Sequence, residues 1–239
     1  MSLTSGRGPL GTDPMGWFTP PIDRPTVFVE PHRRRVRALV EDVAVIDTEV
    51  ALLVHRVGQP LTFAFPADLA GDLPAEPVPE APGYVRVPWD AVDGWEEEGR
   101  RLVHYPPNPY HRVDCRPTDR GLRVEVEGIV LVDTVETVIL FETSLAPVLY
   151  VAKEQVRTDL LERSTSGRQS YCNYKGTPVY WSARIGDSLV EDVAWSYEDP
   201  FPESMPIAGM LSFDLTRSTI HADLPDAPGK VESRGSSIG

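Results

Sequence analysis

The stretch RALVEDVAVIDT (37–48) recurs in altered form as RVEVEGIVLVDT (123–134), at a spacing of 86 residues. Both copies consist of short apolar runs rich in Val, Ile and Leu between turn signals, a pattern typical of β-strands. Each copy predicts a strand, a turn at its Asp-Thr pair, further strands and a short helical turn. A second pair of segments, GYVRVPWDAVDGW (83–95) and GMLSFDLTRSTIHA (209–222), recurs at a spacing of 126 residues.

A repeat of this length indicates two copies of one supersecondary unit. We expect a mainly β fold made of two tandem domains of small antiparallel sheets, with a few short helices. The expected domains are 31–118 and 119–224, between flexible tails at 1–30 and 225–239 that are rich in Pro, Gly and polar residues. The spacing between matching residues is 86 in the first pair of segments and 126 in the second pair. The second copy therefore holds about forty residues, roughly 164–206, that the first copy lacks.

Composition narrows the functional classes. The 239 residues are 41% hydrophobic and 25% charged, which is ordinary for a globular protein, and the formal charge of −13 argues against nucleic-acid binding. No apolar run is long enough for a membrane helix and no signal peptide is apparent, so we expect a cytoplasmic protein with no membrane partner. Two cysteines cannot supply the four ligands of a structural zinc site, and we expect free thiols, no metal and no cofactor.

The inserted segment is unusually rich in aromatic residues. VYWSARI (179–185) and SLVEDVAWSY (188–197) flank Gly186-Asp187, which predicts a hairpin with a two-residue turn. The simple register places Tyr180 opposite Val193 and Trp181 opposite Asp192. One face then carries Tyr180, Val193, Trp195 and Tyr197, and the other carries Trp181, Ala183, Val190 and Asp192. Two interpretations stay open: the rings pack between domains, or they line a small-molecule cleft.

The loop YCNYKG (171–176) precedes this hairpin, and Gly176 allows a tight bend that brings Cys172, Tyr174 and Lys175 to its rim. A thiol close to an ammonium group has a lowered pKa and becomes nucleophilic. The alternative is a loop with a buried, inert cysteine. No local histidine or carboxylate completes a catalytic set, so Cys172 and Lys175 are minor catalytic candidates.

The first copy ends in HYPPNPYHRVD (104–114), which contains His104, His111 and Arg112. Histidine titrates near neutral pH, and arginine can hold a carboxylate or phosphate through two hydrogen bonds. The prolines favour an extended loop, so the alternative is a stiff connector. The spacing of these residues matches no metal-binding template.

The strings YCNYKG, YWS, AWSYEDP and IAGM in the second copy, with VDGWEEEGRRLVHYPPNPYHRVD in the first, resemble the bacterial and fungal family numbered 427 among the domains of unknown function. The resemblance spans about residues 35–224 and implies a tent-like fold, in which two small antiparallel sheets meet at an angle around a cleft. Related tent domains bind small ligands in aromatic cages or reduce methionine sulfoxide, and one family label suggests nucleotidyl transfer. The usual Cys-Pro-x-Lys-Gly of the family reads Cys172-Asn173-Tyr174-Lys175-Gly176 here.

These observations predict a protein that binds a small organic ligand, an anionic or cationic metabolite, in an aromatic-lined cleft of the second domain near the domain junction. The expected ligand-binding residues are Cys172, Tyr174, Lys175, Tyr180, Trp181, Trp195, Tyr197, His104, His111 and Arg112. One alternative is an enzyme, either a Cys172-dependent redox or transfer catalyst or a nucleotidyl transferase. Another is a structural interaction module whose aromatic residues form a homodimer contact.

Overall fold

The computed structural model describes residues 10–14, 16–21 and 26–225. This part of the chain forms two compact units that divide between His111 and Arg112. The expected mainly β fold of antiparallel sheets with short helical turns is confirmed. Among the described residues, no helix has both the length and the apolar character needed to cross a membrane.

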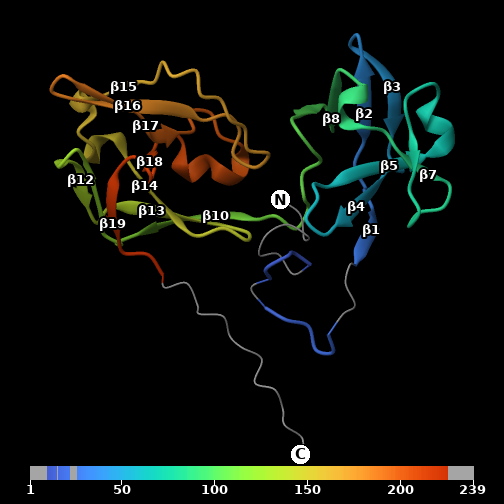
Figure 1. The fold of residues 1–239 in the computed structure, drawn as a ribbon, viewed down its shortest axis with the longest axis horizontal. Coiled ribbons are helices and arrows are strands. Elements are labelled where there is room, and N and C mark those ends of the chain that lie inside the picture. The colour runs from blue at the N-terminus through green and yellow to red at the C-terminus, as the bar shows by residue number, and fades with distance from the viewer. Residues whose placement is uncertain (1–9, 15, 22–25, 226–239) are drawn as a thin grey trace, which may run out of the picture. The chain divides into compact units, whose positions relative to one another are not determined.

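The first unit contains two antiparallel sheets (Figure 1). One has the strand order β1 (Val27–Pro31), β4 (Leu52–Arg56), β5 (Thr62–Pro66), β7 (Tyr84–Arg86), β6 (Glu76–Pro77). The other has the order β3 (Val43–Thr48), β2 (Val36–Val40), β8 (Gly94–Glu97), β9 (Arg100–Leu102). The 3-10 turns are η1 (Ala67–Ala70) and η2 (Trp89–Ala91). The largest core cluster is aromatic at its centre, where Phe65 and Trp95 stack at 5.7 Å.

The second unit also contains two antiparallel sheets. The larger runs in the order β10 (Val113–Thr118), β13 (Thr137–Glu142), β14 (Val148–Val151), β18 (Leu211–Phe213), β17 (Ser188–Ser196), β16 (Val179–Ile185), β15 (Leu161–Arg163). The smaller runs β12 (Ile129–Thr134), β11 (Leu122–Val126), β19 (Thr219–Ala222). Its 3-10 turns are η3 (Lys153–Gln155), η4 (Thr158–Leu160) and η5 (Pro202–Ile207). The long hairpin β16–β17 therefore extends the larger sheet beyond β18.

Corresponding strands of the two units pair in the same registers. In the first unit β1 pairs with β4 from Val27 opposite Arg56, and in the second β10 pairs with β13 from Val113 opposite Glu142. The β2–β3 and β11–β12 hairpins each contain an irregularity, immediately after Ala38 and after Val124. All of these pairs of positions are separated by 86 residues, as in the sequence repeat.

The repeated stretch contains one turn more than the sequence predicted. Glu41-Asp42 and Glu127-Gly128 adopt positive φ and divide each copy into two paired strands, β2–β3 and β11–β12. Asp42 and Gly128, the second residues of the two turns, are of types that tolerate this left-handed backbone, which favours a turn there. The predicted Asp-Thr positions follow at the ends of β3 and β12.

Two boundaries differ from the expected ones. Residues Val27–Glu30, placed in the N-terminal tail by their Pro-rich surroundings, belong to β1 because they pair with β4. The expected boundary at 118 coincides with the end of β10, and this strand belongs to the second unit because it pairs with β13 along its whole length. Within the expected tails, residues 1–9, 15, 22–25 and 226–239 lie outside the part of the chain that the structure describes.

Candidate functional site

The β16–β17 hairpin supplies the aromatic residues of the site. Its turn is the predicted Gly186-Asp187 pair, flanked by Ile185 opposite Ser188, and Gly186 has a φ of 58°. The simple register holds only near this turn. Towards the other end Tyr180 lies opposite Trp195, and Trp181 lies opposite Ala194, so the predicted partners Val193 and Asp192 are wrong.

The cause of this shift is a bulge in β17. Between the pairs Trp181–Ala194 and Ala183–Val190, the single residue Ser182 of β16 lies opposite the three residues 191–193 of β17. Asp192 occupies the bulge with a φ of 54°. A bulge of this kind changes the partner of every later residue. Because the excess is two residues and side chains alternate with a period of two, the predicted faces survive beyond the bulge.

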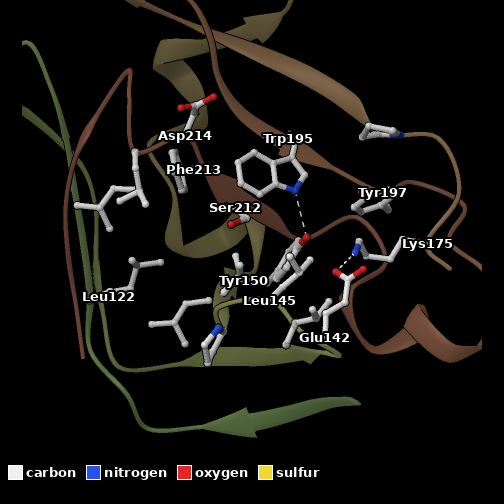
Figure 2. Close-up of a pocket in the computed structure, with 18 of the residues that line it drawn as sticks. Leu122, Glu142, Leu145, Tyr150, Lys175, Trp195, Tyr197, Ser212, Phe213 and Asp214 are labelled. Carbon is white, nitrogen blue, oxygen red and sulfur yellow. Dashed lines mark hydrogen bonds and ion pairs between the residues drawn. The ribbon is translucent and has the colours of Figure 1, made fainter. Parts of the chain in front are cut away.

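The face that carries Tyr180, Trp195 and Tyr197 borders a pocket of about 570 Å³ in the second unit (Figure 2). This volume lies within the range of small-molecule sites. The wall is mostly apolar and comes from β11, β13, β14, β16, β17, β18 and β19 and the loops between them. Its members are Leu122, Leu140, Glu142, Leu145, Pro147, Val148, Leu149, Tyr150, Arg168, Lys175, Pro178, Tyr180, Trp195, Tyr197, Ser212, Phe213, Asp214, Leu215, Thr216, Ile220, Ala222 and Leu224.

A hydrogen bond joins β14 and β17 in the wall of the pocket. The indole Nε1 of Trp195 donates to Tyr150 Oη over 3.1 Å, and Figure 2 shows the two side chains directed towards one another. Burial raises the pKa of Tyr150 above its ordinary value, and burial likewise raises the pKa of Tyr197. Both phenols are therefore neutral at physiological pH, when a phenol can donate as well as accept a hydrogen bond.

A buried ion pair stands beside these rings. Lys175 Nζ donates to Glu142 Oε2, and the side chains of the two residues are 9% and 7% exposed. Lys175 lies within the tight loop that the β-bridge between Cys172 and Gly176 closes, whereas Glu142 ends β13. The pair thus joins the inserted segment to the repeated part of the fold.

A second ion pair lies at another part of the wall. Arg168 Nη1 is 3.5 Å from Asp214 Oδ2, and the Arg168 guanidinium lies 4.5 Å from the centre of the Tyr180 ring. Burial acts to raise the pKa of Asp214, but hydrogen bonds from Thr216 and Arg168 outweigh it and hold that pKa below its ordinary value. Asp214 is consequently an anion at neutral pH, paired with a cation.

Trp181, expected in the binding wall, lies on the opposite face of the hairpin. Its indole Nε1 donates to Ser196 Oγ over 2.9 Å, and its ring packs against the main core cluster of the unit. Lys153 Nζ lies 5.0 Å from the centre of that ring. Because alternate residues of a strand point to opposite faces, Trp181 could not line the same pocket as Tyr180.

Cys172 and Tyr174 also lie outside the pocket wall, although Lys175 next to them belongs to it. The backbone of Cys172 bonds to Gly176, and Ser204 Oγ donates to the carbonyl of Tyr174 over 3.2 Å. The first contact closes the loop, and the second joins it to η5. Cys172 and Cys115 are both free thiols, as expected.

The three residues expected from the end of the first copy divide between the units. His104 and His111 belong to the first unit, and Arg112 opens the second. His104 has a φ of 74°. The Arg112 side chain is 73% exposed and pairs with Asp114 at 3.0 Å. None of the three belongs to the pocket wall.

Several wall residues were missed in the sequence, among them Glu142, Tyr150, Arg168, Phe213 and Asp214. Tyr150 carried a signal, since it is the polar aromatic residue in the apolar strand VLYV. Glu142 carried none, because a Glu at the end of a strand is normally solvated. Its role depends on Lys175, which is 33 residues away in the chain.

The family comparison covers the unit that holds the pocket. Residues 114–223, from β10 to the end of β19, match the family NTP_transf_9, described as a domain of unknown function (DUF427). The second unit is a DUF427 domain. No curated protein matches the chain. The pocket wall lies almost entirely within the matched residues, so the DUF427 domain alone supplies it.

The pocket of the DUF427 domain brings together apolar side chains, neutral phenols and two ion pairs. Across the described residues of the whole chain, no three His, Cys, Asp or Glu side chains are grouped so that they could hold a metal ion. The four charged side chains of the wall form two ion pairs. The arrangement can donate and accept hydrogen bonds at the end of an apolar space.

In the first unit the position equivalent to one wall residue belongs to the main core cluster. The register pairs Trp95 with Ala38 and Ile220 with Val124, which makes Trp95 the counterpart of the wall residue Ile220. Trp95 is 1% exposed and stacks on Phe65. The first unit thus has a buried ring at the position where the DUF427 domain has an aliphatic residue of the pocket wall.

Proposed function

We propose that the protein binds a small organic molecule in the pocket of its DUF427 domain. The observation that carries this proposal is the meeting of Lys175, Tyr180, Trp195 and Tyr197 around one space of about 570 Å³. An apolar wall with a few converging polar groups is typical of a ligand site.

The aromatic residues support the proposal because they present both a ring and a polar atom. Tyr180 is partly exposed, and its hydroxyl lies 2.6 Å from Ser170 Oγ. The Trp195 indole is also partly exposed, although its Nε1 is engaged with Tyr150. Rings held in place by hydrogen bonds lose little freedom when a ligand binds, which favours affinity.

We further infer that the first unit is a diverged copy of the same fold that has lost the binding space. The equal registers of the paired strands and the position of Trp95 support this inference. In this interpretation the first unit contributes stability and the DUF427 domain contributes binding.

The proposal is tested by a thermal-shift screen of the full chain against a broad library of small metabolites. We expect at least one compound to raise the melting temperature, and we expect isothermal titration to give a Kd for it. Replacing Trp195 with Ala should weaken that Kd about tenfold or more, since buried aromatic anchors contribute more than about 1.4 kcal/mol to binding.

Trp181→Ala is the matched control. It removes an indole from the other face of the same hairpin, together with one hydrogen bond, and should lower stability without changing the Kd. Tyr180→Ala, at a partly exposed ring, provides a second test if Trp195→Ala does not fold. Equal losses of affinity in the Trp181 and Trp195 variants, or no stabilising compound at all, would contradict the proposal.

A further inference from the structure

The charges of the side chains in the pocket wall sum to zero. The wall contains four of them, Glu142, Lys175, Arg168 and Asp214. Lys175 pairs with Glu142, and Arg168 pairs with Asp214. The pocket is therefore electrically balanced, although the chain as a whole carries a formal charge of −13.

The pairing of opposite charges matters most at Lys175 and Glu142, because these two side chains are buried. Less than a tenth of either side chain is exposed, so water screens the two charges poorly. A carboxylate ligand that took Lys175 would leave Glu142 buried without its cation. An ammonium ligand that took Glu142 would do the same to Lys175. Removing one member of a buried ion pair is strongly unfavourable, so a charged ligand is selected against at this position.

An intact ion pair still has hydrogen-bonding capacity. An ammonium group has three N–H donors, and a carboxylate has about four acceptor positions. The Lys175–Glu142 bond uses one of each, and Glu142 takes part in a further interaction besides. The pair therefore presents a donor and an acceptor side by side at the surface of the pocket. Tyr197, which is also in the wall, adds a neutral phenol.

We propose that the ligand is uncharged where it meets Lys175 and Glu142, and that it carries an acceptor next to a donor there, as a primary amide or lactam does. This inference rests on the proposed binding function. The ligand carbonyl accepts from Lys175 Nζ, and the ligand N–H donates to the Glu142 carboxylate, so neither charge loses its partner. This differs from the anionic or cationic metabolite that the sequence led us to expect.

The opposite side of the pocket defines the rest of the ligand. Figure 2 shows Leu122 and Phe213 across from Lys175 and Glu142 in this view, and Ile220 is a further apolar residue of the wall. Apolar side chains gain most from contact with an apolar partner. The structure assigns the site to a compact apolar or aromatic body that ends in an uncharged amide-type group.

A series of three probes with one skeleton tests this assignment on the full chain. The probes are 3-phenylpropanamide, 3-phenylpropanoate and 3-phenylpropylamine, which share a phenyl body and differ in the charge of the end group. Kd values at neutral pH come from saturation-transfer NMR titrations, with loss of the signal in Trp195→Ala identifying the pocket. We expect the amide to bind at least tenfold more tightly than the acid and the amine.

Glu142→Gln sharpens the test because it removes the anion and keeps the shape. Lys175 is then an unbalanced cation, so the preference should turn from the amide towards the acid. Glu162→Gln is the matched control, since Glu162 pairs with Arg184 and does not belong to the pocket wall. It should leave the order of the three probes unchanged. If Glu142→Gln does not fold, the order measured on the unaltered chain decides.

Tighter binding of the acid or the amine to the unaltered chain would overturn the inference and leave the proposed binding function in place. Absence of binding by all three probes would also overturn it. The metabolite screen then decides separately whether the pocket binds anything.

Discussion

His55 illustrates how burial determines the chemistry of one residue. It lies on β4 in the first unit with 0% exposure, and its Nε2 is 2.9 Å from Glu30 Oε1. Its Nδ1 is buried without a hydrogen-bond partner. Burial lowers the pKa of His55 and outweighs the opposing effect of Glu30. The imidazole is therefore neutral in the folded protein at neutral pH.

This lowered pKa predicts a pH dependence of stability. The unfolded chain has the higher pKa, about 6.5, and so binds the proton first as the pH falls. The contribution of His55 to the free energy of unfolding is complete above that pH and declines below it. We expect the opening free energy of the β4 and β5 amides, measured by hydrogen exchange, to decrease between pH 7 and pH 5.5.

The difference between the unaltered chain and His55→Gln isolates this contribution, because Gln does not titrate. The two stability profiles should converge as the pH falls from 7 to 5.5. His221→Gln, at an exposed position on β19 of the DUF427 domain, is the control and should leave the β4 amides unaffected. Parallel profiles for His55→Gln and the unaltered chain would rule out this role of His55.

Single residues of the pocket divide into those that the sequence could indicate and those that it could not. Tyr180, Trp195 and Tyr197 were predicted to share a face, because strand periodicity requires only local order. Glu142 was not predicted, since its burial results from contact with Lys175 from another segment. Trp181 was assigned to the wall from aromatic density alone, which carries no information about the side of the sheet.

Among the elements, β17 carries the feature that orients the site. The Asp192 carboxylate in its bulge accepts hydrogen bonds from Ser166 Oγ at 2.9 and 3.0 Å, and the Asp192 backbone N–H donates to Ser182 Oγ over 3.3 Å. Asp is one of the few residues with a side chain that tolerates positive φ. Both the backbone and the side chain of Asp192 thus hold the bulge.

We expect Asp192→Ala to reduce the stability of the DUF427 domain by about 1–3 kcal/mol, from lost hydrogen bonds and the strain of Ala at positive φ. Asp192→Asn should cost clearly less, because Asn tolerates this backbone and keeps an oxygen that can accept from Ser166. Urea unfolding of the domain measures both values. If the Asp192→Ala variant has a free energy of unfolding at least as large as that of Asp192→Asn, the bulge does not depend on this side chain.

At the scale of the whole molecule, binding is expected to belong to one unit. Every residue of the pocket wall lies in the unit that begins at Arg112. We therefore predict that residues 112–228, expressed alone, fold and bind the compound found in the screen with a Kd within about threefold of the full chain, a difference of about 0.65 kcal/mol.

The measurement is an NMR amide correlation spectrum of the fragment, followed by titration. Dispersed resonances with an unchanged Kd support the prediction. A folded fragment with strongly reduced affinity would mean that binding requires the first unit. The corresponding fragment 1–111 should not bind the compound, because Trp95 occupies the space equivalent to the wall at Ile220.

The sequence by itself determined the mainly β class, the hairpin turn at Gly186-Asp187 and the resemblance to DUF427, because alternation, turn chemistry and motifs are all local properties of the chain. Tertiary structure decided the bulge at Asp192, the burial of Glu142 against Lys175 and the placement of Trp181 outside the pocket. Each of these depends on which distant segment lies alongside, and the free energy of such contacts comes from burial and pairing that no local pattern encodes.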